Sequence, residues 1–176
     1  MPFFVFPHHN YRGKMAKVSG EEVTSQLNKS GCSCLNEDQR YPHKNLFLGG
    51  GEVLPLKSDV DPELILQLSF MQSISLTTIV IGLPENDSCP KTIKLFCNRC
   101  NMGFDEAKDI NPVQTIDIEQ GVKTVTVNLL ATKWTRTDTI TLFVEENHGG
   151  DVTELHSLRF FGKPLMGTDV SQIKKC

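Results

Sequence analysis

The chain has 176 residues, which is enough for one well-buried core and short for two. Apolar residues make up 39 % and charged residues 22 %, values that are ordinary for a soluble globular protein. The net charge of −3 provides no broad basic field that would favour nucleic acid or an anionic membrane. No apolar run approaches the ~20 residues that cross a bilayer.

The first segments of the chain predict an arm, a short helix and loops. Residues 1–18 show no period, and we expect a flexible N-terminal arm there. Ser19 followed by Glu22 has the spacing of a capping box, which predicts a helix from about Gly20 to Lys29. After a loop rich in Cys, Asn and Asp, short strands or cover are expected at 46–48 and 53–56 around a glycine turn.

The strongest signal lies between Ser58 and Leu83. From Leu64 to Phe70 apolar and polar side chains alternate, which predicts a strand with one apolar face. The second run, 74–83, is apolar on both parities and rich in β-branched residues, which is typical of a central strand. Residues 71–73 interrupt the pattern, so we predict two strands that form the first pair of a β-sandwich.

Period-two alternation continues along the rest of the chain. Strands are expected at 91–97, around 116–118, at 124–129, 139–144 and 153–161, with one helical turn at 105–108. Short strands at close spacing, with little helix, are typical of an all-β sandwich. The tail beyond Pro164 is polar, and we expect residues 166–176 to be mobile.

The six cysteines offer the sharpest chemical alternatives. Cys32 and Cys34 form a C-x-C pair, while Cys97 and Cys100 form a C-x-x-C pair. Two such pairs suit a four-thiolate zinc site, and a C-x-x-C alone suits thiol redox chemistry. We favour ordinary reduced thiols, because the start of the chain lacks a secretory signal and no long helix follows Cys100.

Other residues give no catalytic arrangement. Asp59 and Asp61 flank a turn beside Pro62, where aspartates usually cap backbone amides. The histidines lack metal-ligand spacing, and no serine sits in a nucleophile motif. We therefore predict a protein that is not an enzyme and carries no cofactor and no metal. A sugar-binding alternative would use Trp134 and Tyr41 as stacking rings.

Several short segments together resemble the PITH domain, the C-terminal module of thioredoxin-like proteins that associate with the 26S proteasome. The matching segments, in chain order, are Gly31-Cys32-x-Cys34-Leu35-Asn36-Glu37, Ser58-Asp59-x-Asp61-x-x-Leu64, Phe70-x-Gln72, Pro90-Lys91-x-x-Lys94-x-Phe96-x-Asn98, Met102-x-Phe104, Pro112-x-Gln114, Thr141-x-Phe143-Val144-x-x-Asn147 and Phe161-Gly162-x-Pro164. The resemblance runs from about Leu27 to Lys175. The arm is too short for a thioredoxin domain, so the chain looks like a stand-alone member.

The resemblance implies a galactose-binding-like jelly-roll sandwich over residues 19–165. It also implies a non-catalytic, cytoplasmic or nuclear protein–protein interaction module, with 26S proteasome subunits as the expected partner. We expect a monomer that binds neither nucleic acid nor membrane. Exposed loops on a rigid scaffold are the usual place for binding, and Lys174, Lys175 and Cys176 in the tail are further candidate contacts.

Overall fold

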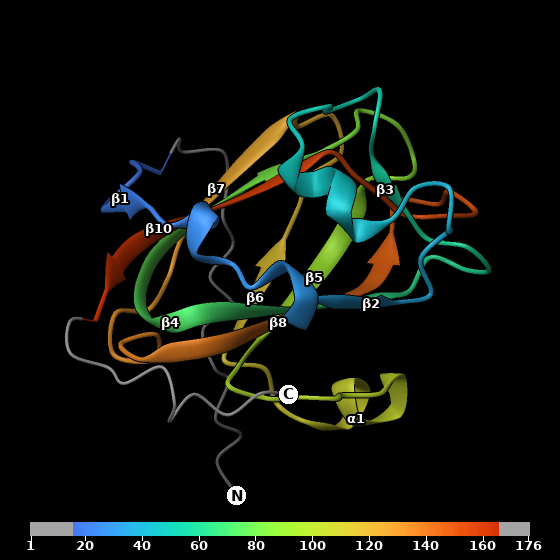
Figure 1. Ribbon diagram of the computed structural model, residues 1–176. Coiled ribbons are helices and arrows are strands. Elements are labelled where there is room, and N and C mark those ends of the chain that lie inside the picture. The colour runs from blue at the N-terminus through green and yellow to red at the C-terminus, as the bar shows by residue number, and fades with distance from the viewer. Residues whose placement is uncertain (1–15, 166–176) are drawn as a thin grey trace, which may run out of the picture.

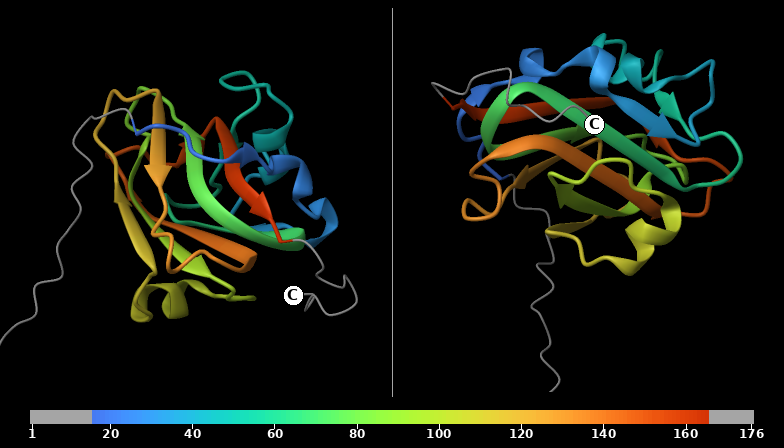
Figure 2. Two further views of the ribbon diagram at one scale, coloured as in Figure 1. Left: turned by 90° about the vertical axis from the view of Figure 1, so that its left-hand side faces the viewer. Right: turned by 60° about the horizontal axis from the view of Figure 1, so that its bottom comes forward.

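One long strand organises the molecule. The computed structural model describes residues 16–165, and β4 (Leu64–Gly82) runs through the middle of its sheet. The first half of β4 pairs with β8 (Thr137–Asn147), and the second half pairs with β10 (Ser157–Pro164) and β7 (Thr124–Asn128). Figure 2 shows β4 curling from one layer of the sandwich into the other.

Two layers of antiparallel strands enclose the main core (Figure 1). The first layer contains β2 (Ser33–Leu35), the start of β4, β8, β5 (Pro90–Cys97) and β6 (Gln114–Asp117). The second contains β1 (Glu21–Glu22), β10, the end of β4, and β7. A separate small sheet joins β3 (Leu56–Lys57) to β9 (Glu154–Leu155). The prediction of a jelly-roll β-sandwich is confirmed.

The predicted pair at 64–83 is wrong in one respect: the two runs are halves of one strand and do not pair with each other. The register with β8 shifts between Ser69 and Ile74, which places the interruption at 71–73 in a bulge. A bulge bends a strand and increases its twist, so the apolar face of β4 stays on the core as the strand changes layer. Phe70, at the bend, meets Phe160 of β10 edge to face at 5.6 Å between ring centroids.

The continuous helix predicted from Gly20 to Lys29 is also wrong. Two 3-10 helices, η1 (Thr24–Gln26) and η2 (Lys29–Gly31), follow β1 there. The backbone N–H of Val23 donates to Phe160 O at 2.8 Å, and the Phe160 N–H donates to Thr24 Oγ1 at 2.9 Å. Pairing with β10 therefore replaces the capping box. A further 3-10 helix, η3 (His43–Phe47), occupies the segment predicted as strand or cover at 46–48.

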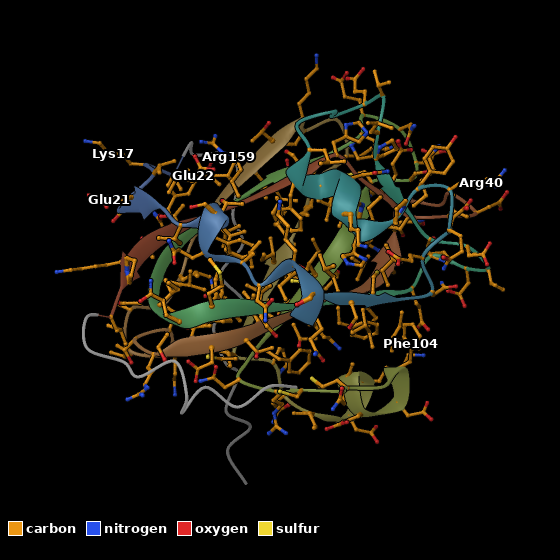
Figure 3. All side chains as sticks on the ribbon, in the orientation of Figure 1. Lys17, Glu21, Glu22, Arg40, Phe104 and Arg159 are labelled. Atoms are coloured by element: carbon orange, nitrogen blue, oxygen red, sulfur yellow. The ribbon has the colours of Figure 1, made fainter. Side chains whose placement is uncertain are left out.

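A second, smaller core lies outside the first layer. The helical turn predicted at 105–108 is confirmed as α1 (Phe104–Asp109), which lies below the sheet in Figure 1. Met102 in the preceding loop and Ala107 of α1 pack on the outer face of the layer. There they form a small core with Ile65 of β4, Phe96 of β5 and Phe143 of β8. Figure 3 labels Phe104, whose ring packs at 6.1 Å from that of Phe143.

No helix in residues 16–165 is long and apolar enough to cross a membrane.

Candidate interaction surface at the loop end

Four connecting segments meet at one end of the sandwich, which we call the loop end. These segments are residues 36–63, 83–89, 118–123 and 148–156. Backbone hydrogen bonds join them: Ser58 N–H donates to Thr153 O at 2.9 Å, and Glu154 N–H donates to Ser88 O at 3.0 Å. The first two segments and residues 148–156 lie toward the right of Figure 1. The loop end is therefore one connected surface.

Asn36 holds the longest of these segments in shape. Its backbone has a left-handed φ of 66°. Its side-chain amide donates to Asp61 Oδ1 at 2.9 Å and to Glu63 O at 2.7 Å, and its Oδ1 accepts the Val60 N–H at 3.2 Å. Asp61 Oδ1 also accepts the Glu63 N–H at 2.9 Å, which confirms the capping role predicted for this aspartate. Asn36 and Asp61 of the matching motifs thus brace a loop.

Asn147 does the same for the segment that follows β8. Its side-chain amide donates to Gly150 O and Val152 O, both at 3.0 Å, and its Oδ1 accepts the Gly149 N–H. A buried hydroxyl adds a third tie, because Ser58 Oγ accepts the Thr153 N–H at 2.7 Å. These side chains satisfy loop backbone groups that have no ladder partner, so the loop end is held rigidly on the sandwich.

A buried histidine supports the base of the long segment. His43 begins η3, and its backbone N–H donates to Glu37 Oε2 at 2.6 Å. Its Nδ1 lies 2.9 Å from the same oxygen. Its Nε2 is buried and has no hydrogen-bond partner. The contact between Glu37 and His43 fixes the chain between β2 and η3. It was not predicted from the sequence, where His43 shows no spacing typical of a metal ligand.

A pocket opens on the loop end. It has a volume of about 380 Å³ and is lined by Glu52, Pro84, Glu85, Asn86, Glu154 and His156. The Glu154 carboxylate lies largely buried, with 14 % of its side chain exposed, and its Oε1 is 3.2 Å from His156 Nε2. Lys123 reaches Glu85 at 3.7 Å across a largely exposed ion pair. The pocket wall is therefore mainly anionic.

The same negative balance extends around the pocket. The three shorter segments carry the acidic residues Glu85, Asp87, Glu119, Asp151 and Glu154, against Lys123 as their basic residue. At the other end of the molecule, Figure 3 labels Arg159 and Glu22, which form an exposed ion pair at 2.8 Å. The loop end is thus a negatively charged surface on a chain with a net charge of only −3.

The rings proposed for sugar stacking do not form a platform. Trp134 is 0 % exposed and belongs to the main core. Tyr41 lies on the loop end, but the Lys57 ammonium sits 4.5 Å from its ring centroid and Arg40 lies 5.9 Å away on the same ring. Stacking on a sugar needs an open apolar ring face, and these two rings do not provide one.

The cysteine pairs do not form a reaction centre in the described part of the chain. Cys97 is free whereas Cys100 is disulfide-bonded, so these two do not bond to each other. Burial raises the pKa of the Cys97 and Cys34 thiols, and it raises that of Cys89 to about 11. A reactive thiol needs a lowered pKa. Within residues 16–165 no three His, Cys, Asp or Glu side chains gather in a way that could hold a metal.

The predicted tail contacts Lys174, Lys175 and Cys176 lie outside the described residues, as do residues 1–15 of the arm predicted at 1–18 and the whole mobile tail predicted at 166–176. The residues of the pocket were not predicted from the sequence. They come from three separate loops, and none of them stands in a spacing that indicates a site.

Comparison with known proteins gives a consistent picture. The PITH domain family model matches residues 14–176. Over 176 residues the chain is 28 % identical to Thioredoxin-like protein 1 of Schizosaccharomyces pombe, covering 93 % of this chain and 60 % of that protein. It is 27 % identical to the Drosophila melanogaster PITH domain-containing protein CG6153, covering 79 % of this chain and 68 % of that protein. The chain thus spans about three fifths of the length of the yeast relative.

Solved structures with the same fold include a bacterial carbohydrate-binding module and a fragment of a putative chitobiase. The family 32 CBM of Clostridium perfringens NanJ, solved in complex with galactose, gives a TM-score of 0.58 at 13 % identity over 78 % of this chain and 94 % of the module. A putative chitobiase fragment of Bacteroides thetaiotaomicron gives 0.59 at 9 % identity over 88 % of this chain and all of the fragment. At such identities the likeness shows the fold alone.

Proposed function

Because this chain belongs to the PITH domain family, we propose that it is a non-catalytic module that binds a protein partner through its loop end, and that the partner is the regulatory particle of the 26S proteasome. Membership of the family implies an interaction module. The proteasome is proposed on the resemblance of the motif segments, and with it a location in the cytoplasm or the nucleus. We further propose that the module acts as a monomer.

The observation that carries this proposal is the combination of rigid loops with exposed aliphatic side chains. Val53 and Val60 are each 81 % exposed, and Leu48 is 65 % exposed, all within the segment 36–63. Folding gains nothing from such exposure, whereas a partner that covers these side chains removes apolar surface from water. Loops that are already ordered also lose little entropy when they bind.

Two other functions are less well supported. Sugar binding has the support of fold likeness to carbohydrate-binding modules, but Trp134 is buried and Tyr41 is covered by two cations. Thiol chemistry at Cys97 would need a thiolate near neutral pH, whereas burial raises the pKa of this thiol. We therefore retain protein binding as the proposed function.

The test is direct binding to the purified regulatory particle by biolayer interferometry, with the chain immobilised through one terminus. We expect saturable binding. A chain carrying Trp134→Ala, which removes a large core side chain and unfolds or loosens the sandwich, should lose it. Absence of binding by the folded wild-type chain would remove the proteasome from the proposal.

A further inference from the structure

We propose that the loop end binds an extended partner segment in which a lysine or arginine is flanked by aliphatic residues, with the cation in the pocket of Glu52, Glu85 and Glu154. This inference rests on the proposed function and adds the chemistry of the partner. It is carried by an exposed apolar loop that is joined directly to an anionic pocket.

The apolar element is the turn from Leu48 to Leu54. Gly49 and Gly51 have left-handed φ values of 73° and 53°, and Val53 N–H donates to Gly50 O at 3.1 Å, so the turn projects as a closed loop. Leu48, Val53 and Leu54 are 65 %, 81 % and 41 % exposed. Three large aliphatic side chains on one projecting turn make an apolar surface with no cover in the described residues.

The anionic element is joined to this turn through Glu52, which belongs to the turn and also lines the pocket. Across the pocket, Glu154 holds a largely buried carboxylate beside His156, and Pro84 is a buried part of the floor. A carboxylate that is partly removed from water attracts an approaching cation more strongly than a fully exposed one. The Lys123 ammonium is 70 % exposed and contacts Glu85 at 3.7 Å. Within the described residues Glu154 bonds His156, and neither Glu154 nor Glu52 forms an ion pair with a lysine or arginine.

The pocket suits an organic cation. In the described chain no group of three His, Cys, Asp or Glu side chains is placed to hold a metal ion. A volume of about 380 Å³ accepts a long side chain. Lysine and arginine carry apolar stems below their charged groups, so the stem can lie along Pro84 while the charged group faces the carboxylates. A segment bearing aliphatic neighbours would at the same time cover Leu48 and Val53.

The experiment is a chemical-shift titration of the ¹⁵N-labelled chain with two probe peptides. One is acetyl-Leu-Val-Lys-Leu-Arg-Val-Leu amide, and the other has glutamate in place of lysine and arginine. We expect the cationic peptide to shift the amide signals of residues 48–54, 85–86 and 154–156, and the glutamate peptide to leave them unchanged.

Matched variants separate the two elements. Val53→Ser should weaken binding of the cationic peptide about fivefold. Leu130→Ser, which removes a 46 % exposed aliphatic side chain beyond the end of β7 that lies away from the loop end, should leave the affinity unchanged. Glu52→Gln should weaken binding of the cationic peptide by a similar factor. Glu106→Gln on α1 removes the same charge far from the pocket and should leave the affinity unchanged. All four side chains are exposed, and the spectra report directly whether each variant is folded.

Any other outcome of the peptide titration overturns the inference. Equal shifts with both peptides would mean that charge does not select the ligand. Shifts confined to other residues, or shifts of the loop end on raising the protein concentration alone, would assign the surface elsewhere or to a second copy of the chain. If the regulatory particle binds equally well to wild type, Val53→Ser and Glu52→Gln, this surface is wrong while the proposed function stands. If the peptide data hold and the particle does not bind, the partner is wrong while the surface stands.

Discussion

Asn36→Ala tests whether motif residues act as braces for the loop end. The substitution removes the donations to Asp61 and Glu63 and the bond accepted from Val60, and it leaves alanine at a left-handed φ of 66°. At a partly exposed site the lost hydrogen bonds are worth roughly 1–2 kcal/mol together. The left-handed backbone adds about 1 kcal/mol for a residue with a Cβ. We therefore expect the free energy of unfolding to fall by about 2–3 kcal/mol.

Urea denaturation followed by far-ultraviolet circular dichroism gives this free energy. Asn36→Gly should recover about 1 kcal/mol of the loss, because glycine accepts the left-handed backbone. Asn101→Ala is the matched control: Asn101 has a φ of 55°, but its side chain makes no hydrogen bond within the described residues, so only the backbone cost of about 1 kcal/mol remains. A loss below 1 kcal/mol for Asn36→Ala, or equal losses at both positions, would refute the bracing role.

Four further predictions concern the scaffold. Gly162→Ala should destabilise the protein by more than about 2 kcal/mol in the same assay, because a Cβ there would lie 2.2 Å from the Ser75 carbonyl oxygen. Gly103→Ala is the control, since its Cβ would meet nothing within 4 Å. Equal losses of stability would contradict the close approach of Gly162 to Ser75. Burial raises the pKa of Cys89 to about 11, so its thiol stays protonated in the folded protein while the unfolded thiol ionises near pH 9. The free energy of unfolding should therefore fall as pH rises from 9 to 11, and Cys89→Ala should reduce this dependence on pH. Alkylation of Cys89 by iodoacetamide at pH 7.5, read by mass spectrometry, should be slow, and a rate equal to that of an unfolded control would refute its burial. Arg159→Gln should cost under about 1 kcal/mol, since its ion pair with Glu22 is half exposed on both sides, and a larger loss would show that the pair does more than join two surface side chains.

Period-two alternation was sufficient to locate most strands. Thr124–Asn128 alternates because one face packs on the main core and the other is more exposed, whereas Thr137–Asn147 is buried on both faces, with Ile140 in the main core and Phe143 in the smaller one. The continuity of β4 was not predictable in the same way. A bulge breaks the alternation at Met71–Ser73 just as a turn would. Only the pairing with the neighbouring strands shows that the chain bends there and continues as one strand.

Tertiary contacts account for the other differences between the predicted and the observed structure. The segment from Gly20 carries helical capping signals, yet hydrogen bonds to Phe160 draw it onto β10. Gln67 was expected on a polar face, but the loop before α1 covers it, and Gln67 Oε1 accepts the Asn101 N–H at 2.6 Å. The pocket residues Glu52, Glu85 and Glu154 lie far apart in sequence and look like ordinary solvated acids until the loops converge.

The structure shows what several asparagines of the matching motif segments do. Asn36, Asn98 and Asn147 each bind loop backbone through their side chains, and Asn98 Oδ1 accepts the Asp138 N–H at 2.8 Å. These asparagines therefore identify how the loops are held, whereas the exposed side chains that would meet a partner lie between them. Family resemblance could thus predict the scaffold and the class of function without identifying the contact surface.

Site-specific photo-crosslinking tests the central claim most directly. Benzoylphenylalanine is placed at position 53 on the loop end in one chain and at position 106 on α1 in another, and each is irradiated with the purified regulatory particle. Both positions are exposed, so the unnatural side chain should be tolerated equally. We predict crosslinks to one particle subunit from position 53 and none from position 106. Crosslinks from position 106 alone, or equally from both positions, would contradict the assignment of the loop end as the docking surface.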